Sequence, residues 1–481
     1  MKNELYIYSI LFFWLFALTG CNKWLDVKPE DKFIEEQLYA TPQGFADALN
    51  GFYIKNGNES SYGGDLTMIT MDVLAQLYAV NSQNTQDNVN LFSTYNYGDK
   101  DARKKIDGIW TATYVNIANA NKFLESLKTY GSRLNPKIKG LYEGEVYGLR
   151  AFYYFDLMRM FTKTFTSVDS LSKTLPYYDK VGRDISEFQP SNFVMQKVLE
   201  DLNKAEQLLL QNDPAVTQDR VSLTTTSTGR TSRNYRMNYY AVRALKARVY
   251  LWKGDKIAAL KEAKFLIDNQ SKFPWIAVTD LNNPAATNKI FSTELILAVE
   301  NPKLNDLFNR VFNPTLFDDR ILAGNTSGTF VKNTIFEGVE GDYRYQYIWK
   351  VAGKTYPTFF KYQDVPAETY SANRTVPLIR MGEMYLIAAE CEIDLSSAIG
   401  YLNQLRTHRN QAAVANTTTP TQLSTHILKE YRREFYGEGQ LFFYYKRTKA
   451  TSIVAALTNS NMSIPANNYV FPIPLSETDP R

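Results

Sequence analysis

Apolar residues recur three and four positions apart along residues 239–251, which is the period of one face of an α-helix. The recurring positions are Tyr239, Val242, Ala244, Ala247, Tyr250 and Leu251. A Gly254-Asp255 pair interrupts this pattern, and the same period returns over residues 258–267. The pattern therefore predicts two antiparallel helices joined by a short turn, with alanines that let the two backbones approach closely.

The order of these signals, alanines followed by Tyr-Leu and then Gly-Asp, resembles one tetratricopeptide unit. Such a unit buries its outer faces only against stacked neighbours. An ordinary helical hairpin would show the same period, so that alternative stays open. We predict similar pairs near residues 109–161, 193–268 and 378–410. The expected fold class is mainly α, a scaffold of tetratricopeptide-like helix pairs with long irregular loops and a few short strands.

Two long segments, about 56–105 and 273–375, lack a sustained helical period. Within the second, residues 294–299 form a short apolar run with strand propensity. Four aromatic residues then alternate with other residues, which predicts a strand that carries all four rings on one face. These rings are Tyr343, Tyr345, Tyr347 and Trp349. We expect helices to resume at Val376.

Residues 1–20 carry the features of an export signal. Lys2 precedes an apolar run over residues 5–18, which is too short for a comfortable transmembrane helix. The run ends in Leu18-Thr19-Gly20-Cys21, which resembles the bacterial lipoprotein signal, in which Cys21 is acylated and becomes the mature N-terminus. A plain secretory signal cut near Gly20 is the alternative. Residues 21–481 are expected to form a single domain.

The amino-acid composition does not favour a nucleic-acid-binding surface, a metal site, a disulfide framework or a cofactor site. Lys and Arg total 54 against 50 for Asp and Glu, so no basic stripe indicates nucleic acid. With two His and two Cys, a His-based metal site or a disulfide framework is not expected, and neither is a cofactor. His408 and His426 are interpreted as surface residues. Arg230 and Arg233, in a Ser/Thr-rich linker, are interpreted as solvated.

Several blocks of sequence resemble one protein family. The blocks are residues 21–26 (CNKWLD), 41–53 (TPQGFADALNGFY), 148–157 (GLRAFYYFDL), 380–390 (RMGEMYLIAAE) and 430–439 (EYRREFYGEG). They resemble the SusD/RagB family, the surface nutrient-binding lipoproteins of Bacteroidota, over nearly all of the mature chain. Leu441 and Tyr444 depart from the family's pattern, which often has Arg and Asp there.

The resemblance implies a non-catalytic binding protein, anchored by lipid and exposed at the cell outer membrane. Such a protein captures oligosaccharide, or in some relatives peptide, and delivers it to a SusC-type TonB-dependent transporter. The family's recognition residues lie in variable loops without a motif, so the resemblance assigns no ligand contact. Two other classes stay open: a surface glycoside hydrolase on a helical scaffold, and a tetratricopeptide-like assembly module without a small ligand.

A pair of carboxylates could be catalytic without any sequence motif, because glycoside hydrolysis needs only two placed Asp or Glu residues. Glu430, Glu434 and Glu438 fall four residues apart and would share one helix face. The nearby arginines are Arg432, Arg433 and Arg447. We interpret the three glutamates as part of an ion-pair network that supports the helices.

A ligand held without a deep pocket needs aromatic faces for stacking, with amide and carboxylate groups beside them. The two irregular segments supply such residues, although each ring taken alone could instead pack its loop onto a helix. The candidates in the first segment are Asp72, Tyr78, Asn81, Asn84, Asp87, Tyr95 and Tyr97. Those in the second are Trp275, Phe317, Tyr343, Tyr347 and Trp349.

Overall fold

The structure, a computed structural model, describes residues 35–182, 184–221, 232–367 and 371–478. The chain divides into two compact units, one ending at Asp47 and the other beginning at Ala48. The predicted signal segment and lipid anchor at Cys21 lie outside the described residues. None of the helices in the described part is long and apolar enough to cross a membrane.

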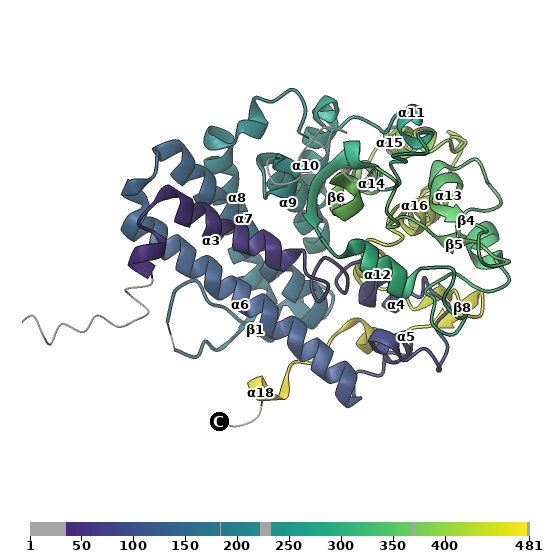
Figure 1. Ribbon diagram of the computed structural model, residues 1–481, viewed down its shortest axis with the longest axis horizontal. Coiled ribbons are helices and arrows are strands. Elements are labelled where there is room, and N and C mark those ends of the chain that lie inside the picture. Colours follow the sequence, from purple (N-terminus) through teal and green to yellow (C-terminus); the bar gives the residue numbers. More distant parts are fainter. Residues whose placement is uncertain (1–34, 183, 222–231, 368–370, 479–481) are drawn as a thin grey trace, which may run out of the picture. The chain divides into compact units, whose positions relative to one another are not determined.

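Helices make up most of the regular structure, which confirms the mainly α prediction (Figure 1). The α-helices are α3 (Pro42–Asn56), α4 (Thr70–Leu74), α5 (Val89–Ser93), α6 (Lys100–Tyr130), α7 (Pro136–Phe161), α8 (Ser191–Asn212), α9 (Tyr239–Lys253), α10 (Lys256–Asp268), α11 (Val278–Leu281), α12 (Leu304–Val311), α13 (Tyr343–Ile348), α14 (Met381–Cys391), α15 (Leu395–Thr407), α16 (Pro420–Glu434), α17 (Leu441–Arg447) and α18 (Leu475–Thr478). The strands are β1 (Lys173–Pro176), β2 (Phe188–Pro190), β3 (Leu295–Glu300), β4 (Trp349–Lys350), β5 (Thr358–Phe359), β6 (Thr375–Arg380), β7 (Ser452–Ala455) and β8 (Ser460–Ser463).

The helix pairs stack on one another in chain order. Helix α7 packs against α6 and α8, α9 packs against α8 and α10, and α10 packs against α14, which pairs with α15 (Figure 1). Each pair therefore buries its outer face against a neighbour, as a tetratricopeptide-like arrangement requires. A buried ion pair reinforces one of these contacts, since Arg150 on α7 donates to Asp201 on α8 at 2.6 and 2.7 Å.

The hairpin predicted around Gly254 is formed by α9 and α10. Asn238 caps α9 by accepting a hydrogen bond from the Ala241 N–H at 2.9 Å. Asp255 caps α10 in the same way, accepting from the Ala258 N–H at 3.1 Å. Gly254 between the two helices has a φ of 86°, a left-handed conformation that glycine adopts without steric cost. Residues next to each boundary therefore encode the turn.

Each strand pairs with one other strand in a short antiparallel ladder. The apolar run predicted as a strand is β3, and its partner is β6. The prediction that a helix resumes at Val376 is therefore wrong, because α14 begins only at Met381. Pro377 lacks the N–H that a helix interior needs, and Val376 favours extended backbone.

The alternating aromatic run is helical, so the prediction of a strand with four rings on one face is also wrong. Residues Tyr343–Ile348 form α13, and only Trp349 continues into β4. Asp342 caps this helix by accepting a backbone N–H two residues later at 2.8 Å. The rings of Tyr343 and Tyr347 lie one helical turn apart, with centroids separated by 6.0 Å. Short apolar runs fit both periods, and here the cap residue favours the helix.

Candidate functional site

Two residues predicted for the site from the first segment lie inside the protein. The Asp72 carboxylate accepts hydrogen bonds from the N–H groups of Gly437 and Gly439 at 2.5 and 2.9 Å. The Tyr78 hydroxyl donates to the Met68 carbonyl at 2.9 Å. Both side chains are buried, and burial raises the pKa of Asp72 to about 8. In this position Asp72 and Tyr78 hold neighbouring turns together and do not face solvent.

Other residues of the first segment are anchored by hydrogen bonds. The Asn81 side chain accepts two backbone N–H groups of its own turn, at 2.9 and 3.2 Å. The Tyr95 hydroxyl donates to the Leu74 carbonyl at 2.8 Å, and the Tyr97 hydroxyl donates to the Asn468 carbonyl at 2.7 Å. Both rings are half-buried. Contact of Asn81, Tyr95 and Tyr97 with a ligand stays a prediction.

Three candidates from the second segment are linked through His408 and its neighbour: Trp275 stacks on His408, the Tyr343 N–H donates to the Arg409 carbonyl, and Tyr343 contacts Tyr347. We call Trp275, Tyr343, Tyr347 and His408 the aromatic shelf. The Trp275 ring stacks on the His408 imidazole, with centroids 4.4 Å apart and planes 16° apart. The Tyr347 hydroxyl donates to the Asn282 side-chain oxygen at 2.5 Å. All four rings of the shelf are half-buried, and Asn282 is exposed. The shelf therefore combines partly exposed rings with an exposed amide.

Arg409 connects the two halves of the aromatic shelf from beneath. Its guanidinium lies 5.3 Å from the centre of the Trp275 ring, and its carbonyl accepts the Tyr343 N–H at 3.1 Å. The side chain is fully buried and forms ion pairs with Glu294 and Glu434 at 2.5 and 2.7 Å. The rings of the shelf thus rest on a polar core that fixes their positions.

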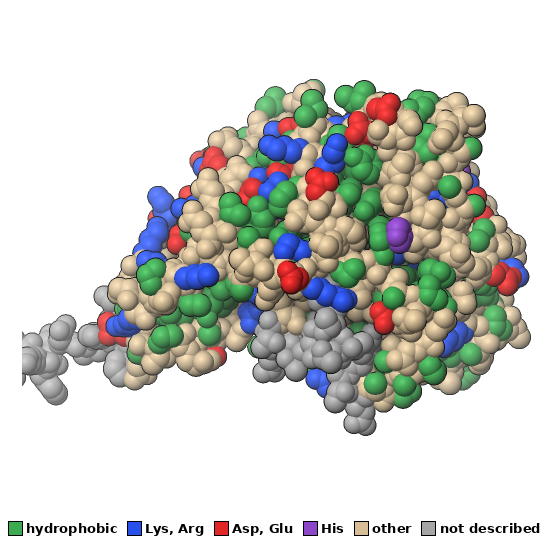
Figure 2. Space-filling view, turned by 90° about the horizontal axis from the view of Figure 1, so that it is seen from above, with side chains coloured by type: hydrophobic (Ala, Val, Ile, Leu, Met, Phe, Trp, Pro, Cys, Tyr) green, Lys and Arg blue, Asp and Glu red, His purple; other side chains and the backbone are tan. Residues whose placement is uncertain are grey.

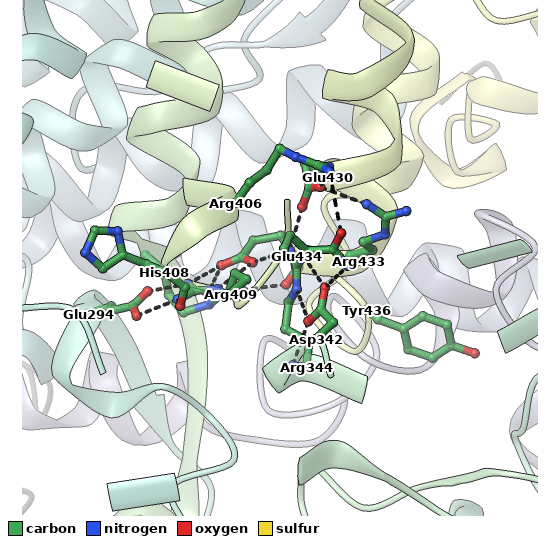
Figure 3. A network of polar contacts seen from close by, with 12 residues as sticks. Glu294, Asp342, Arg344, Arg406, His408, Arg409, Glu430, Arg433, Glu434 and Tyr436 are labelled. Atoms are coloured by element: carbon green, nitrogen blue, oxygen red, sulfur yellow. Dashed lines mark hydrogen bonds and ion pairs between the residues drawn. The ribbon is translucent and has the colours of Figure 1, made fainter. Parts of the chain in front are cut away.

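Glu434, on α16, is the centre of that buried ion-pair network, between Arg409 and Arg344 in Figure 3. Its carboxylate also contacts Arg380 at 2.5 Å. Burial alone would raise the pKa of Glu434, but the three guanidinium groups hold that pKa well below its usual range. The carboxylate therefore stays ionised and serves as a structural anion.

The interpretation of the three spaced glutamates as an ion-pair network is confirmed. Glu430 contacts Arg433 at 2.8 Å, and Glu438 contacts Arg380 at 2.9 Å. Glu438 lies beyond the end of α16, so the three carboxylates do not share one helix face. Of the three nearby arginines, Arg433 joins this network, whereas the other two contact a tyrosine hydroxyl and a different glutamate.

The remaining candidates differ in exposure. Trp349 is buried, and its ring packs against Tyr436 and Phe359 with centroids 4.8 and 5.2 Å apart. Phe317 is 76% exposed. In the first segment, Asn84 is buried and donates to a backbone carbonyl at 3.2 Å. Trp349 and Asn84 thus pack their loops onto the scaffold.

The prediction that Arg233 is solvated is wrong. Its side chain is buried and contacts Glu145 at 2.6 Å and Asp213 at 2.8 Å. Arg230, predicted in the same way, lies outside the described residues. On the face drawn in Figure 2, basic and acidic side chains are interspersed among uncharged ones, as the near balance of charges predicts.

A hollow of about 770 Å³ is lined by a different set of residues, and we call it the polar cleft. Its lining includes Asn50, Tyr53, Asp65, Asp87, Lys105 and Arg236. Asp65 pairs with Lys105 at 2.6 Å, and Asp87 pairs with Arg310 at 2.6 Å. Among these residues sequence reasoning had selected only Asp87. The others come from segments far apart in the chain, and no local pattern marks them.

Metal ligands form no comparable cluster in the described part of the chain: no group of three or more His, Cys, Asp and Glu side chains there is arranged to hold a metal ion. At the aromatic shelf and the polar cleft, the side chains offer stacking, hydrogen bonding and charge pairing.

Comparison with known proteins gives two family matches that together cover more than half of the chain. Residues 310–479 match the model of the SusD family, and residues 23–251 match a model described as starch-binding associating with outer membrane. Two curated relatives from Formosa agariphila are each 24% identical. SusD-like protein P2 matches over 77% of this chain and 65% of its own length, and SusD-like protein P38 over 92% and 91%.

Solved structures share the fold. The crystal structure of a putative sugar binding protein from Bacteroides vulgatus superposes with a TM-score of 0.70 at 20% sequence identity. The superposition covers 91% of this chain and 96% of that one. A SusD superfamily protein from Bacteroides thetaiotaomicron gives a TM-score of 0.68 at 19% identity, over 91% of this chain and 98% of its own. The chain belongs to the SusD/RagB family that its sequence blocks resemble.

Proposed function

We propose that the protein is a non-catalytic binding protein of the cell surface, which captures an oligosaccharide and delivers it to a SusC-type TonB-dependent transporter. The observation that carries this proposal is the aromatic shelf, where rings and an exposed amide lie together on a buried polar support. The name of the similar structure from Bacteroides vulgatus, a putative sugar binding protein, points the same way.

The chemistry of the aromatic shelf suits a sugar. The apolar face of a pyranose ring stacks on aromatic side chains, while its hydroxyl groups need hydrogen-bond partners beside them. Trp275 and Tyr347 supply rings, and Asn282 with the tyrosine hydroxyls supplies polar atoms. Because Arg409 and its carboxylate partners fix the shelf from beneath, little side-chain freedom is lost when a ligand binds.

The carboxylates argue against a glycoside hydrolase. Such an enzyme needs one carboxyl group that holds a proton and another that acts as base or nucleophile, both beside the substrate. Glu434 is buried among arginines that keep it ionised. In the polar cleft, Glu59, Asp65 and Asp87 are each paired with a cation, which leaves Glu300 as one carboxylate where two are needed. Asp72 has a raised pKa, but it is buried away from both surfaces.

Glycan binding and hydrolysis are separated by one experiment. The purified protein is incubated with a panel of soluble polysaccharides and oligosaccharides, and affinity is measured by isothermal titration while chain length is followed by chromatography. We expect affinity without shortening. Chain shortening would support the hydrolase instead. If no glycan binds but a panel of peptides titrated in the same way does, the ligand is a peptide.

The shelf is tested with Trp275→Ala, Tyr343→Ala and Tyr347→Ala. Each should weaken glycan binding by about tenfold or less, because stacking contributes on the order of 1 kcal/mol per ring beyond area burial. Tyr130→Ala, at the end of α6, is the matched control and should leave affinity unchanged. Unchanged affinity in all three shelf variants would place the glycan elsewhere on the protein.

A further inference from the structure

The polar cleft has the size of a small-ligand site and is built from several separate parts of the chain, including Arg236 before α9, Asp87 and Arg374. Its volume of about 770 Å³ lies within the range of about 300 to 1,000 Å³ that is typical of ligand pockets. The end of α3, the loop after it, the start of α6 and the segment after β3 all contribute residues. None of these residues belongs to the aromatic shelf.

Arg236 is held in a fixed position in the lining of this cleft. Its guanidinium donates to the Asn50 side-chain oxygen and lies 4.5 Å from the centre of the Tyr53 ring. Tyr53 is itself fixed, because its hydroxyl donates to Glu145 at 2.5 Å and accepts the Met237 N–H at 3.1 Å. The guanidinium plane is therefore set in place before any ligand arrives.

Arg236 also lacks an acidic partner, unlike most charged groups around it. Among the described residues no carboxylate lies within ion-pair distance of its guanidinium. The nearby Glu145 pairs with Arg233 instead. Elsewhere in the cleft, Asp65 is paired with Lys105 and Asp87 with Arg310.

Two more cations, Lys303 and Arg374, line the cleft and are exposed. Glu300 lines it as well and offsets one of these charges. Glu59 lines the cleft too, and it shares Arg310 with Asp87. Among the described lining residues, the charged groups outside these ion pairs are therefore the three cations Arg236, Lys303 and Arg374 and one carboxylate, Glu300. This balance favours an anionic ligand, and a planar guanidinium suits an oxyanion that accepts two parallel hydrogen bonds.

We propose that the polar cleft binds a saccharide bearing a carboxylate or sulfate group, with Arg236 holding the oxyanion. The exposed side chains of Asn58 and Ser60 in the same lining supply partners for sugar hydroxyls. This inference rests on the proposed function in taking the ligand to be a glycan, and it adds that the glycan is acidic.

The experiment compares three oligosaccharides of equal length: an oligogalacturonate, its neutral galactose counterpart and a sulfated galactose counterpart. Affinities are measured by isothermal titration for the full-length protein and for Arg236→Gln. Glutamine keeps a donor for Asn50 but removes the charge. We expect the protein to prefer an acidic oligosaccharide, and Arg236→Gln to weaken that binding by about ten- to hundredfold with little effect on the neutral one.

Arg133→Gln is the matched control, because Arg133 also lies over a tyrosine ring, 5.0 Å from the centre of Tyr130, but outside the cleft. It should retain full affinity. If Arg236→Gln melts at a lower temperature, Asn50→Ala serves in its place: it keeps the charge, frees the side chain and should weaken acidic binding by a smaller factor. The carboxylated and sulfated arms identify which oxyanion is preferred.

Two results separate the claims. Equal affinity for acidic and neutral oligosaccharides, or an acidic preference that survives Arg236→Gln, would overturn this inference and leave glycan capture intact. Absence of binding to any glycan would overturn the proposed function together with it. If Arg236→Gln loses the preference for acidic oligosaccharides while Arg133→Gln keeps it, the result supports both the proposed glycan capture and the acidic ligand.

Discussion

At the scale of single residues, burial decides which carboxyl groups keep a proton. Glu434 is buried among three arginines and stays ionised. Asp72 is buried as deeply, but mainly backbone N–H groups and a more distant lysine stabilise its charged form. Burial therefore raises its pKa to about 8. Two acidic residues with similar exposure therefore differ in charge at neutral pH because their neighbours differ.

Asp72 should make stability depend on pH. In an unfolded chain an aspartate titrates near about pH 3.9, so between about 4 and about 8 the folded protein holds a proton that the unfolded chain has released. The contribution of Asp72 is complete below that window and is lost as pH rises through it, with a slope of at most about 1.4 kcal/mol per pH unit. Asp72→Asn, which cannot titrate, should lack this component.

The measurement is urea unfolding of both proteins at several pH values across that window. Asp72→Asn should be less stable than the parent, because its amide meets a backbone N–H that needs an acceptor. The stability difference between the two proteins should shrink as pH rises. A difference that stays constant with pH would mean that Asp72 is already ionised in the folded protein.

At the scale of elements, local sequence signals were sufficient where they lie next to the boundary they set. The α9–α10 hairpin could be predicted because its caps and its glycine are adjacent to the turn. The strand β6 could not, because β3, its partner, lies on the far side of a long irregular segment. The aromatic run of α13 fits both periods, and only the Asp342 cap distinguishes them.

The residues of the candidate site also fall into those that the sequence could indicate and those that depend on distant parts of the chain. Trp275, Tyr343 and Tyr347 could be selected because the sequence shows aromatic residues in a segment without a sustained helical period. The same signal also selected Trp349, which is buried. The burial of Asp72 could not be predicted, since Gly437 and Gly439, which cover its carboxylate, come from the opposite end of the chain. Arg236 was missed for a related reason: its fixed position depends on α3, far earlier in the sequence.

Gly254 and Gly400 offer a matched test of the turn between α9 and α10. Neither has an atom within 4 Å of where a Cβ would lie, but Gly254 has a φ of 86° and Gly400 lies inside α15. Gly254→Ala should destabilise the protein by about 1 to 2 kcal/mol, because an L-residue is strained there. Gly400→Ala should stabilise it by roughly 0.5 to 1 kcal/mol. Thermal unfolding measures both, and two effects of the same sign would contradict this account of the turn.

At the scale of the whole molecule, none of the helices that the structure describes has the length and apolar character needed to cross a bilayer. The family model matched by residues 23–251 describes association with the outer membrane. Cys21, at the end of a short apolar run, is the residue that we expect to carry the lipid.

Cys21→Ala should therefore move the protein from the membrane fraction to the soluble fraction when it is expressed in a bacterium that processes lipoproteins. Cys391→Ala is the control, because its thiol is buried in α14 and burial raises its pKa to about 12. That variant should remain with the membrane. If Cys21→Ala still sediments with outer membrane, the anchor lies elsewhere.

The contact between α10 and α14 has a further consequence. These helices pack together although the long segment bearing β3, α13 and most of the aromatic shelf separates them in sequence. The two ends of that segment are held in place by the contact between α10 and α14. Its length and composition can therefore vary while the stacked helices keep their geometry. Relatives with little sequence identity can thus share this architecture while the segment between α10 and α14, which carries most of the proposed binding surface, differs among them.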